Sequence, residues 1–152
     1  MLMLDVEYDF DFLTLGIASR EPAYRVSWFL NKRLGIHLQR EPENYLIMNE
    51  NTENHHLIYF YFCEDELIEY TLIKNKSENI VEEVFSDYSL FDTKNKTSYL
   101  IPEQPKIDYF LKVTELSKSD DLLTKTRNIS LFNAVFDIDV YGLKSKENLI
   151  FD

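Results

Sequence analysis

Carboxylates are the residues of this sequence best suited to chemistry, and near the start of the chain they alternate with apolar residues. The first row consists of Asp5, Glu7, Asp9 and Asp11. Carboxylate oxygens are ligands that Ca²⁺ and Mg²⁺ prefer. An acidic pocket for a divalent cation could therefore be lined by four residues: Asp9, Asp11, Asp137 and Asp139. We favour a solvated strand face, because a cation site also needs ligands from elsewhere in the chain.

The other reactive groups are too few for common catalytic or metal sites. His37 stands alone, and His55 and His56 are adjacent, so their side chains point to opposite faces of a strand. Cys63 is the one cysteine, which excludes an internal disulfide and a zinc site of ordinary spacing. A glycine-rich phosphate loop and a nucleophile elbow are also missing from the sequence. We therefore expect no metal, no cofactor and no catalytic residue, which favours a non-enzymatic role.

The charge of the chain limits its partners. The formal net charge is −11, from 16 Lys and Arg against 27 Asp and Glu, and the basic residues are scattered. Such a field repels nucleic acid and anionic membrane surfaces, so we expect neither as a partner. The start of the sequence lacks the features of a signal peptide, and no apolar run approaches the ~18 residues of a membrane span. By elimination, we expect a cytoplasmic protein.

The most distinctive stretch runs from residue 99 to residue 115 and contains two prolines. Pro102 and Pro105 fix their own φ, lack an N–H and favour extended geometry at the preceding residues. The sequence therefore predicts a short strand, a pre-ordered turn and a longer strand. One face of the longer strand has four apolar residues: Ile107, Tyr109, Leu111 and Val113. Phe110 indicates that the opposite face is partly covered.

Residues 101–109 resemble the signature of the IPExxxVDY family, small bacterial proteins named for that motif. The matching residues are Ile101, Pro102, Glu103, Ile107, Asp108 and Tyr109. Ile107 stands in place of the valine of the motif, which keeps a β-branched residue at that position. The resemblance implies a bacterial cytosolic setting and no established activity, so it supplies no catalytic or binding residue.

Two roles remain open for this motif, recognition and architecture. Its interaction candidates are Pro102, Glu103, Pro105, Asp108 and Tyr109. Glu103, held between the prolines, could be presented to a partner or could cap backbone amides of the loop. Asp108 could brace the same loop by accepting its hydrogen bonds. We favour the architectural role, because motifs of this kind often build a turn.

The rest of the chain predicts an antiparallel sheet with two main helices. Period-2 patterns and turn residues predict strands at residues 5–12, 36–40, 57–63, 67–74 and 131–141, besides the one after Pro105. Residues 45–48 could add an edge strand, and residues 80–85 could form either a further strand or a short helical turn. Helical patterns cover residues 21–34 and 119–129, with Gly35 ending the first and Ser117 or Ser119 capping the second. Tyr24 and Trp28 widen the apolar stripe of the first helix, and we favour a core position for Trp28 over a partner contact.

These elements predict one α+β domain over residues 1–152. Its largely antiparallel sheet has six or seven strands, and its two main helices pack mostly on one face. Residues 144–152 form a short tail whose apolar tip either docks on its own domain or reaches a second subunit. The loop at residues 86–97 carries Tyr88, Leu90 and Phe91 and is a further candidate for a binding surface.

The missing chemistry, the acidic surface and the aromatic loops favour one function class. We expect a non-enzymatic protein-interaction or regulatory domain with a protein partner that the sequence does not identify. A homodimer through a sheet edge or the C-terminal tip is compatible with the same features. The alternative is a small-ligand-binding protein or hydrolase with an acidic, cation-binding pocket.

Overall fold

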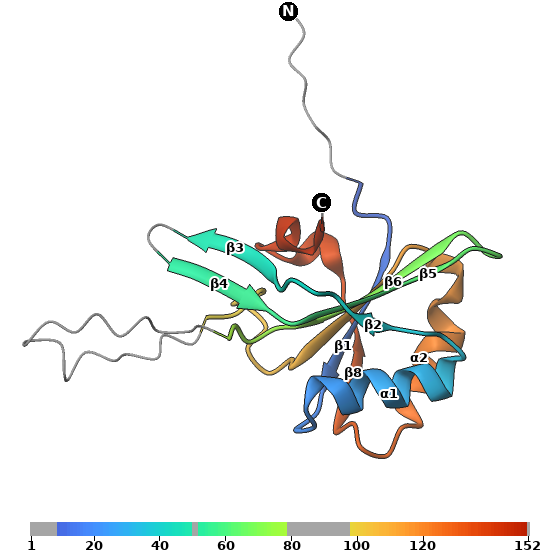
Figure 1. Ribbon diagram of the computed structural model, residues 1–152. Helices are drawn as coiled ribbons and strands as arrows, with labels where there is room; N and C mark the ends of the chain where they lie inside the picture. Colours follow the sequence, from blue (N-terminus) through green and yellow to red (C-terminus); the bar gives the residue numbers. More distant parts are fainter. Residues whose placement is uncertain (1–8, 50–51, 79–97, 152) are drawn as a thin grey trace, which may run out of the picture.

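The protein has an α+β fold whose main sheet is six-stranded and antiparallel, as the alternating patterns predicted (Figure 1). The computed structural model describes residues 9–49, 52–78 and 98–151. The strand order is β2-β5-β6-β7-β1-β8. In chain order the strands of this sheet are β1 (Leu13–Ala18), β2 (Gln39–Arg40), β5 (Ile58–Cys63), β6 (Ile68–Lys74), β7 (Tyr109–Val113) and β8 (Ala134–Asp137). A separate two-stranded antiparallel sheet consists of β3 (Tyr45–Asn49) and β4 (Thr52–His56).

Two helices pack against one face of the main sheet, which confirms the predicted arrangement. They are α1 (Ala23–Leu34) and α2 (Ser119–Arg127). The described residues also contain three short 3-10 turns, η1 (Leu116–Lys118), η2 (Val140–Gly142) and η3 (Lys146–Leu149), and the last two contribute Val140 and Leu149 to a second core. Gly35 ends α1 in the left-handed conformation, with φ 67°, and its N–H donates to the carbonyl of Asn31. Glycine adopts this conformation without the steric cost that a Cβ brings.

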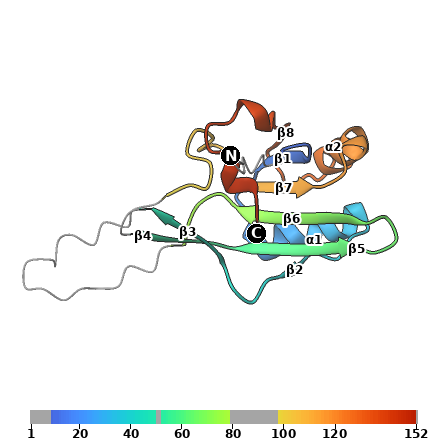
Figure 2. The same ribbon diagram turned by 90° about the horizontal axis from the view of Figure 1, so that it is seen from above.

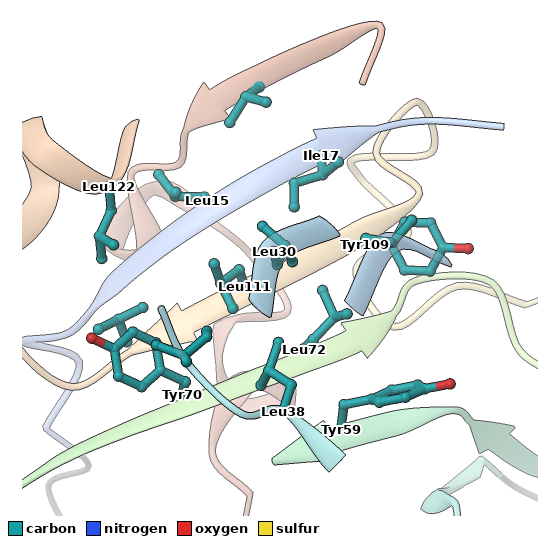
Figure 3. Close-up of a cluster of buried hydrophobic side chains, with 14 of the residues drawn as sticks. Leu15, Ile17, Leu30, Leu38, Tyr59, Tyr70, Leu72, Tyr109, Leu111 and Leu122 are labelled. Atoms are coloured by element: carbon teal, nitrogen blue, oxygen red, sulfur yellow. The ribbon is translucent and has the colours of Figure 1, made fainter. Parts of the chain in front are cut away.

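The first hydrophobic core lies between the helices and the sheet (Figure 3). Val26 and Leu30 of α1 and Leu122 of α2 are buried there against inward residues of the sheet. The sheet residues include Leu15, Ile17, Tyr70, Leu72, Tyr109 and Leu111. Each such aliphatic or aromatic side chain stabilises the fold by about 1.5–3 kcal/mol when it leaves water.

A second core covers the opposite face of the sheet, where no α-helix lies among the described residues. Ile73 and Phe110 point to this face and pack against Leu100, Ile101 and Leu149, all almost completely buried. Residues 98–108 and the C-terminal segment therefore cover this face of the sheet, as the helices cover the other face. In Figure 2 the C-terminal segment lies in front of the sheet and α1 lies behind it.

The start of the chain departs from the sequence prediction. The first strand begins at Leu13, so residues 9–12 precede it, and residues 5–8 lie outside the described part of the chain. Gly16 lies inside β1. The predicted strand at residues 80–85 and the aromatic loop at residues 86–97 also lie outside the described residues.

Three expectations about individual strands are wrong. The alternating pattern of residues 131–141 predicts Phe136 on the apolar face and Val135 on the polar face. The strand is instead limited to β8, where Val135 is buried and Phe136 is 45 % exposed, so the two faces are exchanged. Residues 57–63 are apolar on both alternating faces, which predicts a strand covered on both sides, but at the far end of β5 Phe62 is 41 % exposed. The short strand expected at residues 99–101 is reduced to one bridge between Lys76 and Tyr99.

Helix capping and the tail also differ from the simplest expectation. Neither Ser117 nor Ser119 caps α2, and Glu115 instead accepts a hydrogen bond from the Ser117 N–H at the start of η1. The C-terminal tip docks on its own domain, since Leu149 is completely buried in the second core. The Lys112 Nζ donates to the carbonyl of Leu149 at 2.8 Å and fixes that position.

Candidate functional site

The motif loop, residues 100–108, is held by one buried asparagine in the chain segment before it. The Nδ2 of Asn75 donates to the carbonyls of Gln104 at 2.9 Å and Ile107 at 2.8 Å, and its Oδ1 accepts from the Ile101 N–H at 2.9 Å. Its backbone N–H donates to the carbonyl of Asp108, and its carbonyl accepts from the Leu100 N–H. Asn75 is completely buried. It therefore supplies, inside the protein, the polar partners that this turn would otherwise find in water.

Glu103 binds the C-terminal segment. One oxygen of its carboxylate, Oε2, accepts from the Ser145 N–H at 2.8 Å. Burial alone would raise the pKa of this carboxyl. Hydrogen bonds from the N–H of Glu103 itself and from Ser145 and Lys144 outweigh burial and hold its pKa below the usual value. The Glu103 carboxylate thus caps backbone amides, and those outside its own residue belong to residues 144–145.

Asp108 and Tyr109 bind the turn that leads into α1. The Oδ2 of Asp108 accepts from the Ser19 N–H at 2.8 Å, so its side chain braces that turn and not its own loop. The Tyr109 hydroxyl donates to the carbonyl of Glu21 at 2.6 Å. Burial raises the pKa of Tyr109 well above its ordinary value, which keeps the hydroxyl a donor. Both side chains therefore connect β7 to the start of the first helix.

The apolar members of the motif fill the second core. Ile101 and Ile107 are buried there, whereas Pro102 and Pro105 are exposed. Gly16 of β1 makes room for this packing, because a Cβ at that position would lie 3.0 Å from the Ile107 Cδ1. Ile107 therefore lies on the opposite face of the sheet from Tyr109, although the sequence pattern placed the two together.

The outer face of α1, defined here by Tyr24, Trp28 and Lys32, presents its aromatic side chains to solvent. Tyr24 is 67 % exposed and Trp28 is 55 % exposed, so the expected core position of Trp28 is wrong. The three residues are four positions apart and form one row along the helix. The Lys32 Nζ lies 5.1 Å from the centre of the Trp28 ring, and Phe29 meets that ring edge-on at 4.9 Å. These contacts restrict the Trp28 side chain on the surface.

A basic notch lies beside this face. It has a volume of about 310 Å³ and is lined by Phe29, Lys32, Arg33, Asn128, Ile129 and Ser130. The Arg33 Nη2 donates to the carbonyl of Asn128 at 3.2 Å, so the guanidinium is directed toward the segment after α2. Lys32 belongs to both the outer face and the notch. An exposed aromatic row and a cavity with two cations are thus continuous.

The acidic residues of the alternative hypothesis do not form a metal site. Asp11, Asp137 and Asp139 line one cavity of about 200 Å³, and Asp9 lies nearby, with its Oδ1 accepting from the Asp11 N–H. The Tyr141 hydroxyl donates to Asp11 at 2.7 Å, and this hydrogen bond raises the pKa of Tyr141. Across residues 9–49, 52–78 and 98–151, no group of three or more His, Cys, Asp or Glu side chains could hold a metal ion.

The histidines and the cysteine are separated. His56 is buried, and its Nδ1 donates to the carbonyl of Lys74 at 2.9 Å, which ties β4 to the end of β6. Burial lowers the pKa of His56, opposed by this hydrogen bond, and nearby His55 lowers it further. His37 is exposed and stacks edge-on against Tyr61, while Cys63 is half-buried at the end of β5.

Sequence reasoning missed Asn75 and misplaced Trp28. Asn75 lies in a polar stretch of sequence, residues 74–79, and nothing in that stretch predicts that its side chain is buried. The signal that could have marked Trp28 is the basic character of its surroundings, since Arg25, Lys32 and Arg33 flank it on the same helix. Large aromatics among cations are typical of interfaces as well as of cores.

Comparisons of the chain with known protein families, with curated proteins and with solved structures found no match. The resemblance of residues 101–109 to the IPExxxVDY signature therefore remains a prediction. In the part of the chain that the structure describes, no helix is long and apolar enough to cross a membrane.

Proposed function

We propose that this chain is a non-enzymatic protein-interaction domain and that the outer face of α1 is its docking surface. The observation that carries the proposal is the exposure of Tyr24 and Trp28 on adjacent turns of one helix. Most of the other aromatic side chains in the described residues are at least half-buried. Tryptophan and tyrosine dominate the binding energy of many interfaces, because they bury a large area at little conformational cost.

The arrangement around Trp28 supports this assignment over a purely structural role. Phe29 is partly buried against the first core and touches the Trp28 ring, while Lys32 lies over that ring. A restricted aromatic side chain loses less entropy on binding than a mobile one. Covering Trp28 and Tyr24 would add about 1.5–3 kcal/mol for each side chain that is fully buried.

The motif loop has a different part in this proposal. Its Glu103, Asp108 and Tyr109 bind other segments of the same chain, which supports an architectural role for the IPExxxVDY-like signature. Membership of that family, and with it a bacterial cytosolic setting, is part of the proposal and is supported by the match at residues 101–109.

Site-specific photo-crosslinking in the cells that make the protein tests this assignment. A benzophenone amino acid would replace Trp28, with Phe136, an exposed aromatic of β8, as the matched control and Pro102 as the probe of the motif loop. We expect a discrete adduct from position 28 and none from position 136. An adduct at twice the mass of the chain would make the partner a second copy. Adducts from position 102 alone, or from none of the three positions, would refute the proposed surface.

A further inference from the structure

We infer that the docking surface on α1 takes an acidic protein segment, whose carboxylates bind in the basic notch while an apolar side chain covers Trp28. This inference rests on the proposed function and adds the chemistry of the partner.

The charge of this region is opposite to that of the whole chain. The chain carries a formal charge of −11, yet residues 20–40 contain five cations and one acidic residue, Glu21. These cations include four of the five arginines: Arg20, Arg25, Arg33 and Arg40. The carboxylate of Glu21 pairs with Arg25 of the same region at 3.0 Å. Of these cations, Lys32 and Arg33 line the notch, and local positive charge on an acidic protein favours an anionic partner and steers its approach.

The notch has the features that a carboxylate site needs. Lys32 and Arg33 bring positive charge, and Asn128 and Ser130 bring polar groups at the same cavity. Phe29 and the buried Ile129 supply apolar walls. Such walls lower the local dielectric and strengthen an ion pair. The hydrogen bond from Arg33 to the carbonyl of Asn128 orients the guanidinium in advance, and a planar guanidinium pairs well with a carboxylate.

The apolar and charged parts of the surface are linked by Lys32. Its Nζ lies over the Trp28 ring and its side chain lines the notch. A partner segment that carries an acidic residue within about one helical turn of a large apolar residue would reach both parts at once. Such a pairing combines burial of Trp28 with the charge specificity of the notch.

The same surface features occur in proteins that bind single-stranded nucleic acid, but the charge of the chain argues against that partner. A nucleic acid is a long polyanion and would meet the field of the whole protein, whereas a short acidic segment meets only the local cations. Carboxylates therefore fit this surface better than a phosphate backbone does.

Fluorescence titration tests the inference directly, because Trp28 is the one tryptophan of the chain. The probes are a helical peptide of Glu and Leu without tryptophan, the same peptide with Gln for Glu, and a single-stranded oligothymidine. We expect the Glu peptide to shift the Trp28 emission to shorter wavelength and to bind at least tenfold tighter than the Gln peptide. We also expect its affinity to fall as salt rises. Equal binding of the two peptides, or tighter binding of the oligonucleotide, would overturn the inference.

Charge reversal supplies the matched control. Lys32→Glu should abolish binding of the Glu peptide and create binding of the corresponding Lys peptide, while Lys106→Glu, the same change at an exposed residue of the motif loop, should leave binding intact. Equal losses from the two variants would contradict a local site. If position 28 still forms crosslinks in cells while Lys32→Glu changes nothing, the docking surface stands and the acidic partner does not.

Discussion

The motif loop and the outer face of α1 use their most conspicuous side chains in opposite ways. In the loop, Glu103 binds residue 145 of the same chain, and the buried Asn75 bonds backbone groups of the loop itself. On α1, Tyr24 and Trp28 point away from both hydrophobic cores. In this protein the distinctive motif marks a place where distant segments of the fold are held together, and the less distinctive helix carries the surface that we propose for a partner.

The physical reason for the difference lies in what covers the sheet. On the helical side, regular elements satisfy their own backbone and leave side chains available for solvent. On the other side, irregular segments cover the sheet, and their buried N–H and carbonyl groups need partners from side chains. Asn75 supplies such partners to residues 101–107, and Glu103 supplies one to Ser145.

Replacing Asn75, which holds the motif loop, should have the largest effect on stability. Asn75→Ala deletes three side-chain hydrogen bonds, two of them buried, and leaves their partners unsatisfied, so we expect a loss of about 3 kcal/mol. Urea denaturation measures the change. Asn148→Ala is the matched control, since it deletes one bond to the carbonyl of Leu100 and should cost about 1 kcal/mol. Equal losses would mean that Asn75 does not organise the loop.

Removing the carboxylates of the motif should have the next largest effect on stability. Glu103→Ala and Asp108→Ala each remove a bond from a backbone N–H to a charged acceptor, and we expect each to cost about 1–2 kcal/mol. Because the pKa of Glu103 is lower in the folded than in the unfolded chain, its contribution is present above the ordinary value of 4.5 and is lost as pH falls through the folded pKa. Glu103→Gln should weaken that acid dependence. An unchanged pH profile would argue against its role as a cap.

A buried histidine should make the anchoring of β4 sensitive to mild acid. The pKa of His56 is lowered in the fold, so the unfolded chain takes up the proton first as pH falls below 6.5. Stability should be complete above that pH, decline through the window below it, and level off under the folded pKa. Chemical denaturation between pH 7.5 and 5 would follow the decline. His56→Gln should flatten it, whereas the exposed His37→Gln should not.

The outer face of α1 should contribute least to stability. Trp28→Ala and Tyr24→Ala remove exposed side chains, so we expect changes within about 0.5 kcal/mol of the parent. Phe110→Ala, a completely buried aromatic, should instead cost about 3–5 kcal/mol. A loss above about 1.5 kcal/mol for Trp28→Ala would place that residue with the structural side chains.

The sequence was sufficient for the elements that repeat a period several times. The buried stripe of α1, its glycine stop at residue 35, and the strands at β5, β6 and β7 follow from local patterns. Trp28 could not be placed, because it lies on the flank of the apolar stripe and the width of the buried arc depends on the packing of α1. The faces of β8 were exchanged because a four-residue strand is too short for its period to fix its orientation.

The candidate site was harder to predict, since it depends on contacts between distant segments. Asn75 meets residues 101–107 across about thirty positions of sequence, and Glu103 meets Ser145 across 42. From the sequence alone, the motif that contains Glu103 and Asp108 could serve either partner recognition or the architecture of the loop. Only the positions of Ser145 and Ser19 indicate which backbone amides those carboxylates bind.

The most direct test of the contrast between the two regions is quantitative affinity purification of the tagged protein from the cells that make it. Glu103→Ala, Asp108→Ala and Trp28→Ala would be compared with the parent chain, with the unfolding midpoint of each variant measured alongside. We expect a partner that is kept by both motif variants, despite their lower stability, and lost from Trp28→Ala at unchanged stability. A partner lost from Glu103→Ala while that variant stays folded, and kept by Trp28→Ala, would place recognition in the motif loop and contradict this account.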